Sequence, residues 1–456
     1  MLFKGQLQLR SQIGYGHLMA FSFPSILASL LEPLASVVDT ALVGRLNTEW
    51  LGALALGTTI LSTFTWMFNF LLHASTHSLS EVDEHTRFDS PEKRWREVGD
   101  RVKLSLLFAL VVGLLAVLFL LLFKAPLYQL VGVESRLKPL VDDYFLVRLY
   151  GHPLALVYAT LLSILRGLGN VRLSFYLVSL TTGLNVLLTW FFLYPLEWGL
   201  AGAAWGTVLS SVFGILLCFG WFLASGQRRR GLFQKTWAPT HQWFRFGKNS
   251  GNLFGRSFFL SGSLFLATRV ASEVGVKPLA AHQILLQVWL FASFFTDGVA
   301  ISGNVLGARL ASRYKWRRLR LMFARLLVLG TALGACFCFV YFFGGDWIAR
   351  LFTSDSEVLA ILSQIWVWVA ISQIPNAVAF VYDGLLFGLE GFSHLRKHMM
   401  IGVLLFILPF AYYAWSAQEL LPLWWGLILL NVYRLVSGFY GVEKFIHLLR
   451  STREQR

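Results

Sequence analysis

Long apolar blocks alternate with short polar connections along the whole chain. A membrane-spanning helix needs roughly 20 apolar residues to cross the hydrocarbon core of a bilayer. Several blocks of this length contain no charged residue, among them 104–123, 173–196, 326–345 and 358–382. Each of these blocks therefore predicts one membrane crossing.

The same pattern, followed from end to end, predicts an all-α membrane protein with about twelve transmembrane helices. We expect the spans near 14–43, 51–80, 103–123, 141–165, 174–195, 199–224, 252–272, 279–308, 322–343, 358–388, 399–417 and 420–447. An even number of spans places both termini on the same side of the membrane.

Composition agrees with this interpretation. Of the 456 residues, 56% are hydrophobic and 14% are charged, whereas a soluble domain carries about 25% charged residues. The net charge of +15 comes from basic residues that lie between the apolar blocks, which indicates membrane lipids as partners and not nucleic acid. The three cysteines lie in apolar segments, and we expect them to be buried thiols.

The distribution of basic residues predicts the orientation. Most of the 39 Lys and Arg residues lie in the N-terminal tail, in every second connection and in the C-terminal tail. Because basic connections stay on the cytoplasmic side, we expect both termini to be cytoplasmic, in a bacterial inner (plasma) membrane.

The two halves of the chain resemble each other. Residues 51–54 (LGAL) open the second predicted span after a short turn, and residues 279–282 (LAAH) open the eighth in the same way. Pro153 and Pro375 occupy comparable places in the fourth and tenth spans. Internal repeats are common in transporters. We therefore predict three parts: a six-helix lobe over 1–224, a basic cytoplasmic linker over 225–250 and a second six-helix lobe over 251–456.

Four acidic residues fall inside predicted spans: Glu32, Asp39, Asp297 and Asp383. Ionisable groups in the membrane are costly and tend to be functional. Glu32 and Asp39 are seven residues apart, so they share a helix face about 10 Å apart. Pro33 favours bending of the same helix, which would couple protonation of a carboxylate to helix shape. The alternative is a carboxylate that only pairs with a neighbouring helix.

Two polar pairs at i, i+4 spacing add further candidates. Asn185 and Thr189 share a face of the fifth span, where they would line a cavity or join two helices. His73 and His77 share a face of the second span, as cavity-lining or titrating groups or as polar filling of a helix interface.

Histidine pairs also raise an enzyme alternative, because two histidines at this spacing can bind a metal. A second pair, His394 and His398, lies in a basic cytoplasmic connection. The sequence lacks the adjacent histidines of membrane di-iron enzymes and any phosphate-binding glycine loop. We therefore expect no catalytic residue, no metal and no cofactor, and energy from an ion gradient.

At this point several segments, in order, resemble the multidrug and toxic compound extrusion family, in particular its DinF-like branch. The first span carries VDTALVG at 38–44, and the eighth carries LAAHQIL at 279–285 and FFTDGVA at 294–300. The tenth span carries AFVYDGLLFG at 379–388, and Asn185 is followed by GLAGAA at 199–204.

The resemblance implies two six-helix lobes around a central cavity and export of small amphipathic or cationic compounds by alternating access, in exchange for H+ or Na+. It implies an ion-coupling site at Asp39 and Asn185. Thr189 stands where the branch usually has a second aspartate, so Glu32, His73 and His77 are candidates to compensate, and Asp297 and Asp383 are secondary candidates. We expect a monomer that binds a small-molecule substrate and is not an enzyme.

Two other functions stay open from the residues. A lipid-linked saccharide flippase of the wider superfamily would have extra spans and a strongly cationic cavity, but Arg148, Arg256 and Arg434 lie near predicted span ends. A membrane-embedded metalloenzyme would use the histidine pairs.

Overall fold

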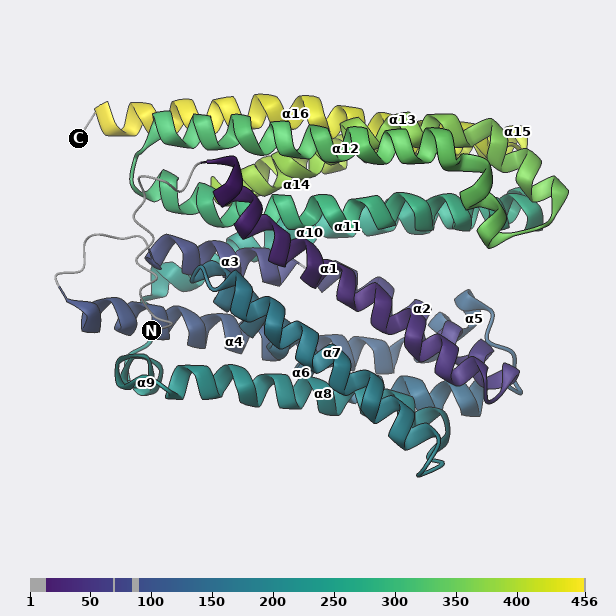
Figure 1. Ribbon diagram of the computed structural model, residues 1–456, viewed down its shortest axis with the longest axis horizontal. Helices are drawn as coiled ribbons and strands as arrows, with labels where there is room; N and C mark the ends of the chain where they lie inside the picture. Colours follow the sequence, from purple (N-terminus) through teal and green to yellow (C-terminus); the bar gives the residue numbers. More distant parts are fainter. Residues whose placement is uncertain (1–13, 69, 84–89, 455–456) are drawn as a thin grey trace. The chain divides into compact units, whose positions relative to one another are not determined.

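The protein is helical throughout the part of the chain that the computed structural model describes, which comprises residues 14–68, 70–83 and 90–454 (Figure 1). No strand occurs in these ranges. The predicted all-α membrane fold is therefore confirmed.

Packing divides the chain into two compact units, Ala28–Ser250 and Met1–Leu27 with Gly251–Arg456. We call them the N-terminal unit and the C-terminal unit. Helix α1 (Tyr15–Gly44) contributes to both. The other helices of the N-terminal unit are α2 (Thr48–Phe68), α3 (Phe70–Asp83), α4 (Pro91–Leu122), α5 (Lys124–Val131), α6 (Lys138–Gly167), α7 (Val171–Leu193), α8 (Gly199–Leu223) and α9 (Gly226–Phe233).

Helix α10 (Thr240–Val274) begins in the N-terminal unit and continues into the C-terminal unit. The remaining elements of the C-terminal unit are α11 (Val276–Ser312), α12 (Trp316–Phe352), α13 (Ser356–Gly388), α14 (Phe392–Gly402), the π-helix η1 (Val403–Ile407), α15 (Leu408–Ala417) and α16 (Leu421–Glu454). The division into lobes at 1–224 and 251–456 stays a prediction.

Eleven candidate spans in the described ranges are long and apolar enough to cross a membrane. Helices α2 and α3 together form the second, and α14 to α15 form another. The predicted seventh span, 252–272, lies in α10, which is long enough but is not among the eleven. Polar residues such as Asn252, Arg256 and Arg269 explain this difference, because they lower the mean hydropathy of α10.

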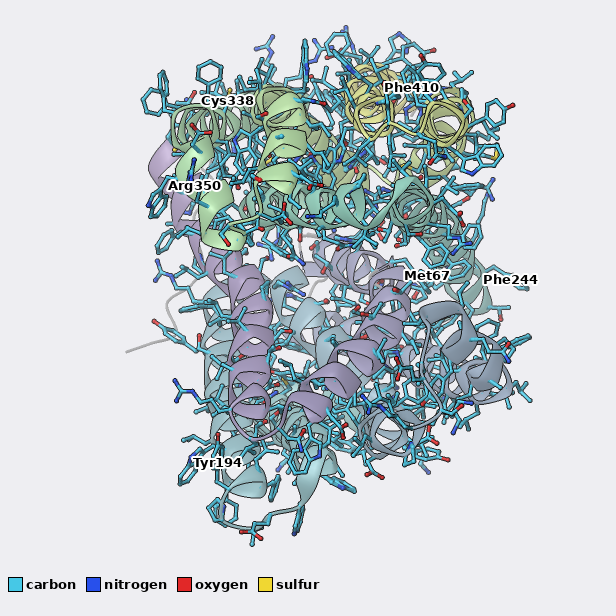
Figure 2. The ribbon with its side chains drawn as sticks, turned by 90° about the vertical axis from the view of Figure 1, so that its right-hand side faces the viewer. Met67, Tyr194, Phe244, Cys338, Arg350 and Phe410 are labelled. Atoms are coloured by element: carbon cyan, nitrogen blue, oxygen red, sulfur yellow. The ribbon has the colours of Figure 1, made fainter. Side chains whose placement is uncertain are left out.

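Helix α12 of the C-terminal unit exposes a row of large apolar side chains. Phe339, Phe343 and Trp347 follow one another at four-residue spacing and are 65%, 72% and 69% exposed. Such a large apolar stripe is unusual on a protein in water, but it suits contact with acyl chains. The cysteine prediction was wrong here, because Cys336 on this helix is exposed and Cys338 (Figure 2) is only partly buried, whereas Cys218 is buried.

The repeat predicted from the sequence has a structural counterpart. Pro153 lies inside α6, which ends at Gly167, and Pro375 lies inside α13, which ends at Gly388. Each proline removes one backbone hydrogen bond from a long helix. The two halves thus place a proline at nearly the same distance from the end of each helix.

Close helix packing in the C-terminal unit depends on glycine. A Cβ atom at Gly384 of α13 would lie 2.2 Å from the carbonyl oxygen of Ala300 in α11. Only glycine allows this approach, which is the usual way that small residues join membrane helices. Within the same unit, α13 packs against α12 and against α16 (Figure 1).

The predicted basic linker, 225–250, packs against α4. Helix α9 crosses α4 where Gly231 meets Gly99, and a Cβ atom at Gly231 would lie 2.1 Å from the carbonyl oxygen of Trp95. Beyond α9, the Gln234 side chain donates hydrogen bonds to the Arg96 carbonyl and to Asp100. The linker is therefore a folded part of the N-terminal unit.

Candidate functional site

Asp39 lies in the second half of α1, within the N-terminal unit. The hydroxyl of Tyr194, at the end of α7, donates a hydrogen bond of 3.1 Å to the carbonyl oxygen of Leu42 (Tyr194 is labelled in Figure 2). This bond fixes the end of α1 against α7, the helix that carries Asn185 and Thr189.

Asn185 and Thr189 form a small hydrogen-bonded group with α8. The Thr189 hydroxyl donates to the Asn185 side-chain oxygen over 3.1 Å, and the Asn185 amide donates to the Thr207 hydroxyl over 3.2 Å. Both Asn185 and Thr189 are buried. Gly206 makes the group possible, because a Cβ atom there would lie 2.6 Å from the Thr189 hydroxyl oxygen.

The carboxylate of Asp39 adjoins this group. Electrostatic interactions link Asp39 to the charge of Arg148 on α6 and to the Thr189 side chain. One of its oxygens, Oδ1, is buried without a hydrogen-bond partner in the described residues. Three helices, α1, α6 and α7, thus bring together one carboxylate, one guanidinium and a polar pair.

Asp383 has a different environment, in the C-terminal unit. Its Oδ2 atom accepts hydrogen bonds from Arg256 of α10 and from Arg434 of α16, the latter over 2.6 Å. Arg434 also donates to the Asn431 side-chain oxygen over 2.6 Å. All three charged side chains are nine-tenths buried or more, with exposed fractions of 9% for Arg256, 6% for Asp383 and 3% for Arg434.

The other predicted residues lie outside these two groups. Asp297 lies in α11 and is partly buried, with partners of its own. His73 and His77 lie on α3, where His77 interacts with Glu81 near the helix end. The side chain of Glu32 lies outside the described part of the chain.

The second histidine pair points toward α16. The rings of His394 and His398 are in contact, with centroids 4.0 Å apart and planes tilted by 36°. His394 donates from Nε2 to the Ser437 carbonyl over 2.9 Å, and Nδ1 of His398 bonds the Tyr433 hydroxyl over 2.7 Å. The described residues contain no group of three or more His, Cys, Asp or Glu side chains placed to hold a metal ion.

The sequence assigned no functional role to three arginines, Arg148, Arg256 and Arg434, because they were taken to lie near the ends of predicted spans. The structure places Arg148 beside Asp39 and the other two around Asp383. Arg434 lies well inside α16, and its distance from either end of the apolar segment was a signal that it is buried. Nothing in the sequence pattern pairs these arginines with particular carboxylates.

Comparison with known proteins identifies the family to which these features belong. The MatE family model matches residues 24–191 and 253–413. Protein DETOXIFICATION 45, chloroplastic, from Arabidopsis thaliana is 30% identical over 92% of this chain and 77% of its own length.

A bacterial relative and a solved structure agree with that match. DNA damage-inducible protein F of Escherichia coli K12 is 24% identical over 91% of this chain and 89% of its own length. The crystal structure of the Vibrio cholerae MATE transporter VcmN in its bent form superposes with a TM-score of 0.84 at 19% identity, covering 96% of this chain and 98% of that one.

Proposed function

Because the chain belongs to the multidrug and toxic compound extrusion (MATE) family of transporters, we propose that it exports small amphipathic or cationic organic compounds by alternating access, in exchange for H+ taken up at Asp39. Members of this family are transporters and not enzymes. The family relationship therefore removes the metalloenzyme alternative. The observation that supports Asp39 as the coupling residue is its buried, unpartnered oxygen beside the Asn185–Thr189 pair.

The polar pair offers a way to accommodate both states of Asp39. The Thr189 hydroxyl has one hydrogen and two acceptor lone pairs. When Asp39 is charged, Thr189 is able to turn its hydrogen from Asn185 toward the carboxylate. When Asp39 is protonated, its own O–H becomes a donor to the Thr189 oxygen, and Thr189 keeps its bond to Asn185. A proton is thus taken up without leaving a new buried group unsatisfied.

Arg148 favours H+ over Na+ as the coupling ion. A sodium ion at Asp39 would bring a second full positive charge near the guanidinium, and like charges repel strongly where water is scarce. A proton instead neutralises the carboxylate and adds no separate cation. The single carboxylate of the group, with Thr189 in place of a second aspartate, also leaves few ligands for a metal ion.

Asp383 is less suited to this role. Two guanidiniums bind the same oxygen of its carboxylate, and protonation would break a buried ion-pair network. Removing one partner of such a network is strongly unfavourable. We therefore assign the coupling role to Asp39, with Asp297, Glu32, His73 and His77 as secondary candidates.

The basic connections support a particular orientation in the membrane. We propose that the protein is a monomer in a bacterial inner membrane with both termini cytoplasmic.

Transport in proteoliposomes tests the proposal. The parent protein should transport a fluorescent cationic dye under an imposed H+ gradient. An imposed Na+ gradient alone should not drive this transport. Asp39→Asn keeps size and polarity but removes titration, so it should fold and lose H+-driven transport. Glu134→Gln, which changes an exposed carboxylate of the same unit, is the matched control. Parental H+-driven transport by Asp39→Asn would exclude the coupling role and leave Asp39 as a helix-pairing residue.

A further inference from the structure

The ion cluster of Arg256, Asp383 and Arg434 joins three helices of the C-terminal unit, α10, α13 and α16. Both guanidiniums bind the same carboxylate oxygen, and each of the three side chains is at least nine-tenths buried. Residues 256 and 383 are 127 positions apart, and residues 383 and 434 are 51 apart. The cluster is thus a product of the tertiary structure.

This cluster carries more positive than negative charge. Arginine stays protonated in proteins, so two guanidiniums and one carboxylate leave a surplus of one positive charge. Within the described ranges, Asp383 is the only carboxylate that forms an ion pair with either arginine. A buried surplus charge is unfavourable unless something compensates it.

The neighbours of the cluster compensate the surplus only in part. The guanidinium of Arg434 lies 5.0 Å from the ring centre of Phe380, and that of Arg256 lies 5.3 Å from the ring centre of Phe387. Asn431 supplies a neutral oxygen to Arg434. Ring faces and an amide oxygen attract a cation but do not neutralise it.

Two donors of the cluster remain unused. The Nε–H groups of Arg256 and Arg434 are buried and have no acceptor among the residues of the described chain. Guanidinium groups present planar sets of N–H donors that match the oxygens of a carboxylate or a phosphate. The surplus positive charge and the two unused N–H donors therefore both indicate a negatively charged partner with oxygen acceptors.

We propose that the Arg256–Asp383–Arg434 cluster is a binding site for a small oxyanion, a carboxylate or a phosphate group with at least one negative charge. The oxyanion belongs to a free solute or to a lipid headgroup, and the chemistry of recognition is the same. The site is separate from Asp39 and does not depend on how Asp39 is coupled.

Binding to the purified full-length protein provides the direct test. Equilibrium dialysis in phosphatidylcholine nanodiscs, with radiolabelled phosphate and then succinate as probes, should show one oxyanion bound per chain. Binding at the level of empty nanodiscs, in phosphatidylcholine and in phosphatidylglycerol alike, would overturn the proposal. Competition that appears only with phosphatidylglycerol would identify a lipid phosphate as the oxyanion.

Variants with opposite effects on the surplus charge separate a binding site from a structural ion pair. Arg256→Gln reduces the surplus to zero and should weaken oxyanion binding at least about tenfold, as expected for loss of a charged hydrogen-bonding partner. Asp383→Asn raises the surplus to two and should bind more tightly than the parent. A purely structural ion pair predicts that both variants lose stability and that neither changes oxyanion affinity.

Arg350→Gln is the matched control, because Arg350 (labelled in Figure 2) is an exposed arginine at the end of α12 in the same unit. It should bind oxyanions like the parent. If Arg256→Gln and Arg350→Gln bind the oxyanion with equal affinity, the bound oxyanion is an adventitious ion only and the proposed site is excluded. Should Asp383→Asn fail to fold, Arg256→Lys decides: it keeps the charge but loses the planar donors, so its affinity should lie between those of the parent and Arg256→Gln.

Discussion

Neighbouring residues decide what the carboxylates of Asp39 and Asp383 are able to do. Asp39 has one oxygen without a hydrogen-bond partner among the described residues, and it adjoins a hydroxyl that is free to change its acceptor. Asp383 is held by two guanidiniums. An aspartate in the N-terminal unit is thus able to exchange a proton, whereas an aspartate in the C-terminal unit is held in ion pairs.

The Thr189 position tests whether the α7 pair belongs to the coupling site. Thr189→Asp places a second titratable group one turn from Asn185, where the side chain is fully buried. We expect normal expression and a changed pH dependence of transport, measured in proteoliposomes over a series of pH values. Thr181→Ser, a conservative change elsewhere on α7, should leave the profile as in the parent. Coincident profiles for parent and Thr189→Asp would place Thr189 outside the site.

At the scale of helices, the start of α13 depends on a charged cap. The Asp355 side chain accepts hydrogen bonds from the backbone N–H groups of Glu357 and Val358, over 2.9 and 3.3 Å, and pairs with Lys277. The Lys277 ammonium and these N–H groups hold the pKa of Asp355 below its ordinary value. The cap is therefore strongest in its charged form.

This cap predicts a pH-dependent difference in stability. A depressed folded-state pKa stabilises the fold fully above the unfolded-state pKa of about 4, and the stabilisation is lost as pH falls through the folded-state value. Asp355→Asn keeps an acceptor for the cap but not the charge. The melting temperature of Asp355→Asn should lie below that of the parent at neutral pH, and the two melting temperatures should converge in strong acid. A gap that is the same at both pH values would contradict the charge effect.

The contact between α9 and α4 gives a second prediction for helices. Gly231→Ala would push a methyl group against the Trp95 carbonyl, so it should destabilise the packing of the linker by about 1–3 kcal/mol, the usual range for overpacking. Limited proteolysis between α9 and α10, followed over time, measures the effect. Gly226→Ala, where a Cβ atom meets nothing within 4 Å, is the control. Equal cleavage rates of the two variants would show that the glycine contact is dispensable.

For the whole molecule, the basic connections predict orientation. A reporter fused after Arg456 and another inserted within 225–250 should both give a cytoplasmic signal, because the basic connections resist translocation. A reporter in the loop between α7 and α8 should give the opposite signal and serves as the control. A periplasmic signal at either of the first two positions would contradict twelve spans with cytoplasmic termini.

The sequence by itself determined the helices and the places of the two prolines within them. The predicted span 174–195 corresponds to α7 (Val171–Leu193), and the prolines of the fourth and tenth spans fall inside α6 and α13. These predictions succeed because apolar length is a local property: every backbone group in the bilayer must be satisfied within its own helix. The order of the motifs along the chain then indicated the MATE family.

Only the tertiary structure decided which charges meet. It brought Arg148 to Asp39 and closed Arg256 and Arg434 around Asp383. It also placed the basic linker on α4 through the contact of Gly231 with Gly99. Such pairs join residues far apart in the chain, and they depend on which helix faces touch and at what depth. A hydropathy pattern records that a residue is polar but not which distant side chain compensates its charge.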